Sequence, residues 1–418
     1  MALMRWPAVA TAHALGVLLL GLHWAVRAPT WHRVAAVLAY IAGAEVLWRM
    51  TESAPVYEYG KYASVAIMLL ALLRSRARLR LLPTLYLLLL LPSSVFTLQG
   101  APFHIAREQI SFNLSGPLAL ALAVTFFANV SMTRRDVVAL ALTLCGPIAA
   151  IAAISVVATS GLDPSAFQGE SVHAVAAGFG PNQVSSVLGL GVLAGFLLLL
   201  SRLLPLRLVW VTVALTAVFA TQSILTFSRG GVALALGSIA AGSLPLVRPR
   251  RSRTQLALYL SGFALVFALV VWPAVSEFTG GRVDARYRDT TTSGRMDIVR
   301  ADLETWQHNF WLGVGPGMTL VHRLSLGWGA SAHTEFTRLL AEHGVLGLLA
   351  LACLLLLALG SARVRSDAFA RGTVIAFLTW ALLFMSINAM RTVAPAFVFG
   401  LACAVIRPWE RPEASPPS

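Results

Sequence analysis

The sequence is poor in charged residues. Only 12% of its 418 residues are charged, whereas 57% are hydrophobic. A soluble globular domain averages about 25% charged residues, so this chain has too few charges to cover a soluble surface. The class that remains is a polytopic membrane protein.

Acidic residues are scarcer than basic ones, with 18 against 32, which gives a net charge of +14. The basic residues form short arginine clusters between apolar runs. This pattern is typical of membrane loops held by anionic lipids and by the positive-inside bias. It argues against nucleic acid as a partner and makes membrane lipids an expected one.

Cysteines and metal-ligand motifs are also few. The three cysteines, Cys145, Cys353 and Cys403, lie inside apolar runs and are expected to be buried and unpaired. The chain has neither a His-Glu-x-x-His motif nor an Asp-x-Asp pair, so no metal site and no cofactor are predicted. It also lacks Gly-x-Ser-x-Gly, which leaves a serine hydrolase without support.

Long apolar runs fill most of the chain. About 20 apolar residues cross a bilayer core, and the runs predict an all-α polytopic membrane protein with roughly 12 or 13 transmembrane helices. Residues 1–275 are expected to carry transmembrane helices, 276–343 an extracytoplasmic loop that is partly helical, 344–407 further transmembrane helices, and 408–418 a cytoplasmic tail. The predicted location is the cytoplasmic membrane.

Arginine clusters set the predicted orientation. They fall at residues 74–80, 134–135, 202–207, 248–253 and 363–371. The positive-inside rule places all of them in the cytoplasm. Alternation of the spans then places residues 277–344, with eight of the 18 acidic residues, on the outer side. The same count places the N-terminus outside.

Polar residues outside the arginine clusters converge on this outer side. Candidates for substrate binding among them are Glu170, Asn182 and Arg391. An outer cavity lined with arginine and histidine would suit a ligand that carries phosphate, because guanidinium binds phosphate with two parallel hydrogen bonds.

Two arginines are candidates for anion binding. Arg229 follows an apolar run in TFSRGG, where it is either an interfacial arginine or part of an anion site. Arg295 is either a solvated helix end or a ligand-binding residue. It opens a helical pattern with an apolar stripe at Met296, Val299, Leu303, Trp306 and Phe310. The acidic residues Asp297, Asp302 and Glu304 are expected on the solvated face of that helix.

His333 begins a second helical run, HTEFTRLLAEHG. Histidine titrates near neutral pH and can take a proton from a hydroxyl, although a histidine at a helix start is also a common structural residue. An ion-pair ladder is expected on the same helix from Glu335, Arg338 and Glu342, and His343 is expected at the membrane interface. The preceding LGVGPGM segment is predicted to be a tight turn, not a phosphate loop.

These pieces occur in a recognisable order. TFSRGG follows a span, SGR opens an amphipathic helix, a Trp/Phe-rich run ends in LGVGPG, and AHTEFTRLLAEHGVLGLL enters a span. In this order they resemble the O-antigen ligase and polymerase superfamily of membrane glycosyltransferases, and GFGPNQ resembles an upstream outer loop of that family. The resemblance covers roughly residues 172–359.

The resemblance implies a catalytic histidine at His333 and two functional arginines at Arg229 and Arg295. It also implies a metal-independent, inverting transfer of glycan from a polyprenyl-diphosphate donor, such as undecaprenyl diphosphate, to a glycan or lipid acceptor. Many members have Asn after the histidine, whereas this chain has Thr334. Two other functions stay open: a transporter or flippase of lipid-linked or anionic solutes, and a structural subunit of an envelope complex.

Overall fold

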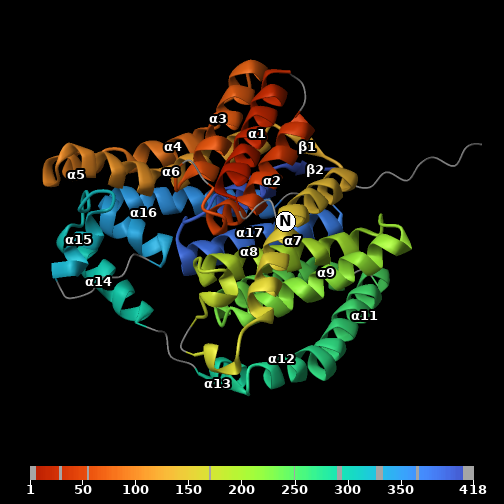
Figure 1. Cartoon of the computed structure of the whole chain (residues 1–418). Helices are drawn as coiled ribbons and strands as arrows, with labels where there is room; N and C mark the ends of the chain where they lie inside the picture. The colour runs from red at the N-terminus through yellow and green to blue at the C-terminus, as the bar shows by residue number, and fades with distance from the viewer. Residues whose placement is uncertain are drawn as a thin grey trace, which may run out of the picture.

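The computed structural model describes residues 6–27, 31–53, 56–168, 171–248, 250–289, 294–325, 333–363 and 367–407. In this part of the chain most residues are helical (Figure 1). The first group of helices is α1 (Pro7–Val26), α2 (Trp31–Met50), α3 (Tyr59–Ser75), α4 (Leu81–Leu90), α5 (Ser94–Gly100) and α6 (Phe103–Phe127). The second group is α7 (Arg134–Ser160), α8 (Pro181–Ser201), α9 (Leu206–Leu225), α10 (Arg229–Val247), α11 (Arg250–Val266) and α12 (Trp272–Phe278).

The third group begins with the short helices between the last two long apolar segments. It consists of α13 (Arg282–Arg288), α14 (Arg295–His308), α15 (Met318–Ser325), α16 (Glu335–Ala362), α17 (Ala368–Asn388) and α18 (Ala394–Ala402). A short parallel pair, β1 (Ser131–Met132) with β2 (Val405–Ile406), joins the start of α7 to the end of α18.

Ten helical segments of the described chain are long and apolar enough to cross a membrane. The protein is therefore an all-α, multi-pass membrane protein, as its composition predicts. Three further predicted spans correspond to α2, α3 and α18, which are shorter or more polar. Helix α3 has 17 residues and α18 has nine, and α2 carries the charged Glu45 and Arg49 inside an otherwise apolar sequence.

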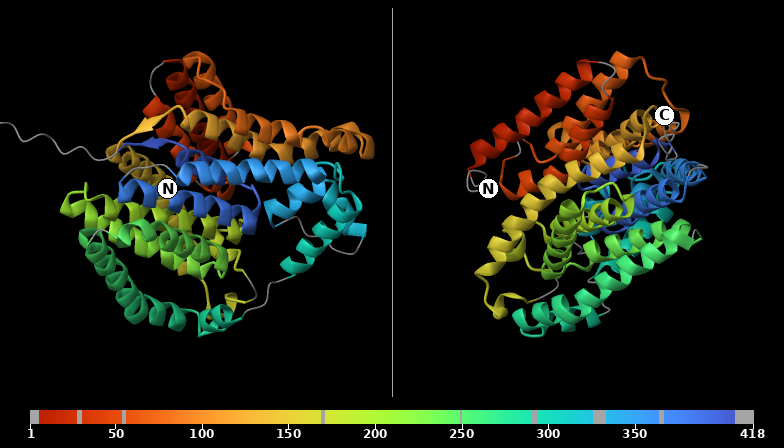
Figure 2. Two further views of the ribbon diagram at one scale, coloured as in Figure 1. Left: turned by 180° about the vertical axis from the view of Figure 1, so that it is seen from behind. Right: turned by 90° about the vertical axis from the view of Figure 1, so that its right-hand side faces the viewer.

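Helix α8 lies at the centre of the bundle, with 94% of its apolar window buried. Glycines allow its backbone to approach α10 closely. A side chain at Gly189 would meet the carbonyl oxygen of Gly231 at 2.3 Å, and one at Gly231 would meet that of Ser185 at 2.0 Å. Small residues drive helix packing in lipid because they let backbones come together. By contrast, α11 and α12 form an arc at the edge of the molecule (Figure 2) and bury almost none of their surface.

Arginine clusters that are far apart in the sequence meet at one end of the bundle. Arg80 donates to the carbonyl after α6 at 2.9 Å, and Arg134 pairs with Asp367 at 2.9 Å. The guanidinium of Arg202 bonds to the Gln255 amide oxygen. We call this end the arginine end. The opposite end, where α2 and α17 finish and α14, α15 and the start of α16 lie (Figure 1), is called the site end.

A glycine turn and a break in α16 interlock at the site end. Gly344 has φ 61° and ψ −136°, which interrupts the helix. The amide of Val345 therefore donates to the carbonyl of Phe310 at 2.8 Å, and the carbonyl of Ala341 accepts from Val314 at 3.0 Å. The LGVGPGM segment is thus a tight turn, as predicted, and it supplies the backbone hydrogen bonds that α16 lacks at the break.

Candidate active site

His333 lies just before α16 and is half-buried. The next residue, Thr334, caps the helix, since its side chain accepts from the amide of Phe336 at 3.3 Å. The carbonyl of His333 accepts from the amide of Ala389 at 3.0 Å. The helix cap at Thr334 and the backbone bond to the segment after α17 therefore fix the backbone at this histidine.

Three arginines from three different elements act electrostatically on His333. Burial lowers the pKa of His333 to about 4, and the positive charges of Arg391, Arg295 and Arg323 act in the same direction. Arg295 comes from the start of α14, Arg323 from α15, and Arg391 from the segment between α17 and α18. At neutral pH the imidazole is therefore neutral, which is the form that can accept a proton.

A cavity of about 330 Å³ opens at the site end. Its basic lining residues are Lys61, Arg323, Arg338 and Arg391, and its acidic ones are Glu335 and Glu342. Aromatic and amide groups are supplied by Tyr57, Phe112, Gln109 and Asn113. His333 is not itself a lining residue, but its carbonyl accepts from the amide of Ala389, which lines the cavity, as does Glu335, two residues after the histidine. The arrangement combines a proton acceptor with groups that can bind anions and hydroxyls.

Arg323 pairs with Asp302 inside the site, and each side chain is almost completely buried. Asp302 also accepts from Thr337 at 3.0 Å. Burial raises the pKa of Asp302, while the neighbouring Arg323 opposes that rise. The Nε atom of Arg323 has no hydrogen-bond partner among the residues that the structure describes. A buried donor of this kind is a candidate for ligand binding.

The expectation that Asp302 is solvated is therefore wrong. Helix α14 buries a face made by Ile298, Ala301, Asp302 and Thr305, whereas Met296 of the predicted apolar stripe is 47% exposed. The buried face of α14 differs from the predicted apolar stripe because α14 packs against α16 through small and polar residues. Arg323 was missed altogether, since no local pattern distinguishes it from a solvated arginine.

The predicted ladder on α16 is confirmed, but it is buried in the cavity wall. Arg338 pairs with Glu335 and with Glu342, each at 2.5 Å. Glu342 also accepts from the amide of Gly317 at 2.9 Å. The expectation that His343 lies at the membrane interface is wrong: it is wholly buried, because the glycine turn, α4 and Ser93 cover this part of α16.

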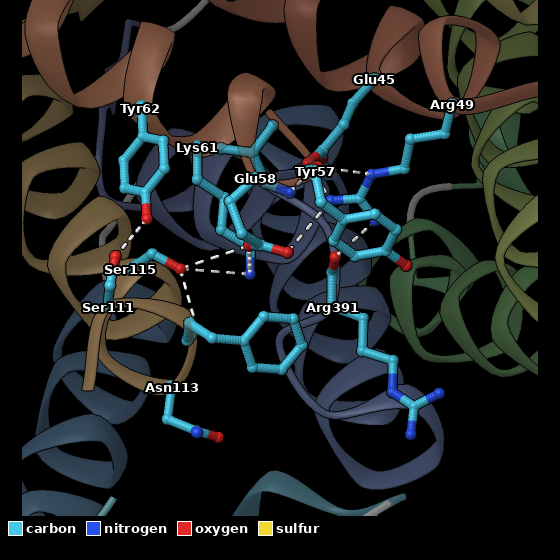
Figure 3. A network of polar contacts seen from close by, with 12 residues as sticks. Glu45, Arg49, Tyr57, Glu58, Lys61, Tyr62, Ser111, Asn113, Ser115 and Arg391 are labelled. Carbon is cyan, nitrogen blue, oxygen red and sulfur yellow. Dashed lines mark hydrogen bonds and ion pairs between the residues drawn. The ribbon is translucent and has the colours of Figure 1, made fainter. Parts of the chain in front are cut away.

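A second buried network connects α2 and α3 beside the cavity (Figure 3). Arg49 pairs with Glu45 at 2.7 Å and with Glu58 at 3.5 Å. Glu58 pairs in turn with Lys61, which lines the cavity, and accepts from Ser115 at 3.3 Å. Sequence reasoning missed this network, although charged residues within an apolar run are themselves a signal of function.

Two further predicted residues, Arg229 and Asn182, lie at the site end but do not line the cavity. Arg229, at the start of α10, donates to the carbonyl of Asp289 and is not among the described residues that line the cavity. Asn182 is half-buried at the start of α8, and its neighbour Gln183 bonds to Arg49 instead. Glu170 lies outside the described residues.

Within the described ranges, no three histidine, cysteine, aspartate or glutamate side chains cluster as metal ligands. The site is instead built from arginine, lysine, glutamate and a neutral histidine.

The fold and the site together define a multi-pass membrane protein with an arginine-lined cavity close to His333, at one end of its helical bundle. Residues 222–352 match the family model described as O-antigen ligase. The predicted resemblance is confirmed for this segment, which is less than half of the chain and contains Arg229, Arg295 and His333. No curated protein matches the chain.

Proposed function

We propose that this protein is a glycosyltransferase that moves a glycan from a polyprenyl-diphosphate donor to an acceptor hydroxyl, as a ligase or a polymerase. The observation that carries the proposal is the neutral His333, on which three arginines act, with its backbone bonded to Ala389 of the cavity wall. The family match over residues 222–352 supports the same reaction class.

In the proposed reaction, His333 takes the proton from the acceptor hydroxyl. The hydroxyl oxygen attacks the anomeric carbon of the donor, and the bond from that carbon to the diphosphate oxygen breaks. The diphosphate leaves with the bonding electrons, and the guanidinium groups of Arg295 and Arg391 stabilise the charge that develops on it. Arg229 would contact the donor from α10. Attack opposite the leaving group inverts the anomeric configuration.

The cavity lining suits the sugar part of the substrates. Asn113, Gln109 and Glu335 can exchange hydrogen bonds with sugar hydroxyls. Tyr57 and Phe112 stack with ring centroids 6.4 Å apart, which gives an apolar surface beside these polar groups. The proposal places the glycan here, with its diphosphate toward the arginines around His333.

The arrangement of charge supports an orientation in the cytoplasmic membrane. Exposed arginines gather at the arginine end, and the positive-inside rule assigns such an end to the cytoplasm. The cavity at the opposite end would then face outward, where a translocated lipid-linked glycan is presented.

The test is transfer by the purified protein in lipid nanodiscs, supplied with a polyprenyl-diphosphate glycan and candidate acceptors. His333→Ala is expected to lower the rate about 10²- to 10⁴-fold, because general base catalysis typically contributes that much. His104→Ala, at an exposed histidine on α6, is the matched control. Transfer is expected to continue in the presence of EDTA.

A wild-type rate in the His333→Ala protein would reject this mechanism. Solute flux in vesicles without any glycan transfer would instead favour a transporter of lipid-linked or anionic solutes. Comparison of single-transfer and repeat-unit products separates a ligase from a polymerase.

A further inference from the structure

The segment between α17 and α18 brings Arg391 to the cavity. Its first residue, Ala389, has φ 50° and ψ −152°, a backbone conformation that non-glycine residues rarely adopt. Such a conformation persists only where the surrounding structure fixes it. The contacts that fix this segment therefore determine where Arg391 lies.

Helix α2 holds the segment through two side chains on adjacent turns. Glu45 accepts from the amide of Val393 at 2.5 Å, and Arg49 donates to the carbonyl of Arg391 at 2.9 Å. These two contacts lie on either side of Thr392. On the cavity side, the amide of Ala389 donates to His333 at 3.0 Å.

We propose that Glu45 and Arg49 are positioning residues, which act through the backbone of residues 389–393 to hold the Arg391 guanidinium beside His333. The proposal rests on the function proposed above for that site. It assigns a role in the reaction to a charged pair on α2, which lies outside the segment that matches the ligase family.

Arg49 is itself fixed in several directions, so it can act as a rigid support. Its guanidinium bonds to Glu45 at 2.7 Å, to Gln183 at 2.9 Å and to the carbonyl of Tyr57 at 3.2 Å. The ring of Tyr57 also lies 4.2 Å from the guanidinium carbon. Figure 3 shows the Arg49 guanidinium facing the Arg391 backbone, while the Arg391 side chain extends away from the network.

Packing alone does not account for a charged pair at this position. An apolar pair of similar volume would join α2 to the segment without the desolvation of two charges. Only groups that bond to a specific carbonyl and a specific amide can fix the backbone on both sides of Thr392. Fixing the backbone there fixes the direction in which the side chain of residue 391 leaves it.

A change in the position of Arg391 should change the pKa of His333. The charged groups that act on this histidine are Arg391, Arg295 and Arg323, and burial acts in the same direction. If Arg391 moves away, the effect of one of these three positive charges on the imidazole becomes weaker. The pKa of His333 then rises from about 4 toward its ordinary value of 6.5.

The test compares Glu45→Gln and Arg49→Lys with Glu58→Gln in the full-length protein. Glu58 is also buried and also pairs with Arg49, but it makes no hydrogen bond to residues 389–393 in the described chain. The readout is the rate at which diethyl pyrocarbonate modifies His333, followed by peptide mass spectrometry across pH. This measurement does not depend on glycan transfer.

We expect the midpoint of modification to move up by about 1 pH unit in Glu45→Gln and Arg49→Lys, the usual effect of a nearby charge, and to stay unchanged in Glu58→Gln. The acid limb of the pH profile of kcat should move in parallel. The value of kcat/KM should fall about 10- to 100-fold, the size of loss that a small misplacement produces.

A third variant tests the contact without altering a buried charge. Val393 has φ −75°, which suits proline, so Val393→Pro removes the amide that donates to Glu45 and should move the midpoint in the same direction. Unmoved midpoints in all three variants would show a purely structural role. A moved midpoint in a protein without transfer activity would leave the positioning intact and reject the proposed function.

Discussion

The two ends of the bundle use arginine in different ways. At the arginine end, the side chains of Arg134 and Asp367 are 19% and 29% exposed. At the site end, those of Arg338 and Glu335 are 6% and 1% exposed. Exposed pairs contribute about 0–1 kcal/mol, and buried charges carry a large desolvation cost. The charges at the site end are therefore costly to bury, as expected if the proposed reaction uses them, whereas those at the arginine end are not.

Removal of a buried arginine at the site end is expected to change the free energy of unfolding most. Arg338→Ala leaves Glu335 and Glu342 buried without their partner, so we expect a loss of about 3–5 kcal/mol in the free energy of unfolding. Arg135→Ala, at an exposed arginine of the other end, should change it by less than about 0.5 kcal/mol. Denaturant unfolding in detergent measures both, and similar losses would remove the distinction between the ends.

The break in α16 gives the next largest effect. A side chain at Gly344 would meet the amide nitrogen of Leu312 at 2.6 Å, and φ there is +61°. Gly344→Ala should therefore destabilise the protein by at least about 2 kcal/mol, through left-handed strain and overpacking. At Gly146 of α7 nothing lies within 4 Å, so Gly146→Ala should be stabilising by about 0.5 kcal/mol. Thermal unfolding of the two proteins would contradict this account if both shifted downward equally.

A single buried hydrogen bond beside that break gives a smaller effect. Ser93 and the Nδ1 atom of His343 lie 2.5 Å apart in a buried environment. Ser93→Ala should lower the free energy of unfolding by about 1–3 kcal/mol, because the imidazole loses a partner that water cannot replace. Ser160→Ala, at an exposed serine, is the matched control. Equal stability of Ser93→Ala and wild type would show that His343 finds another partner.

Much of this architecture follows from local pattern. Apolar runs predict the spans because about 20 residues must cross the bilayer. The glycines of LGVGPGM predict a turn because glycine readily adopts positive φ, and all three do so in the structure. The spacing of Glu335, Arg338 and Glu342 predicts their pairing. Each of these features depends on residues that are close in the sequence.

The composition of the cavity wall depends on residues that are distant in the sequence. Asp302 and Arg323 lie on two short helices whose buried faces are set by packing against α16, so neither helix alone indicates the pair. Glu45 and Arg49 could have been suspected, since charged residues in an apolar run mark functional positions. Their connection to Arg391, more than 300 residues later, follows only from the folded arrangement.

The smallest predicted effect tests the arginine end itself. A double-mutant cycle on Arg134→Ala and Asp367→Asn should give a coupling energy of about 0.2–1 kcal/mol, which should shrink as salt screens this partly exposed pair. Asparagine is chosen because Asp367 also caps α17, accepting from Ala370 at 2.8 Å, and asparagine preserves a cap. Glycan transfer should be unchanged throughout the cycle. A coupling above about 3 kcal/mol, the range of buried pairs, would mean that exposure does not separate the two ends and that the arginine end also holds the fold together.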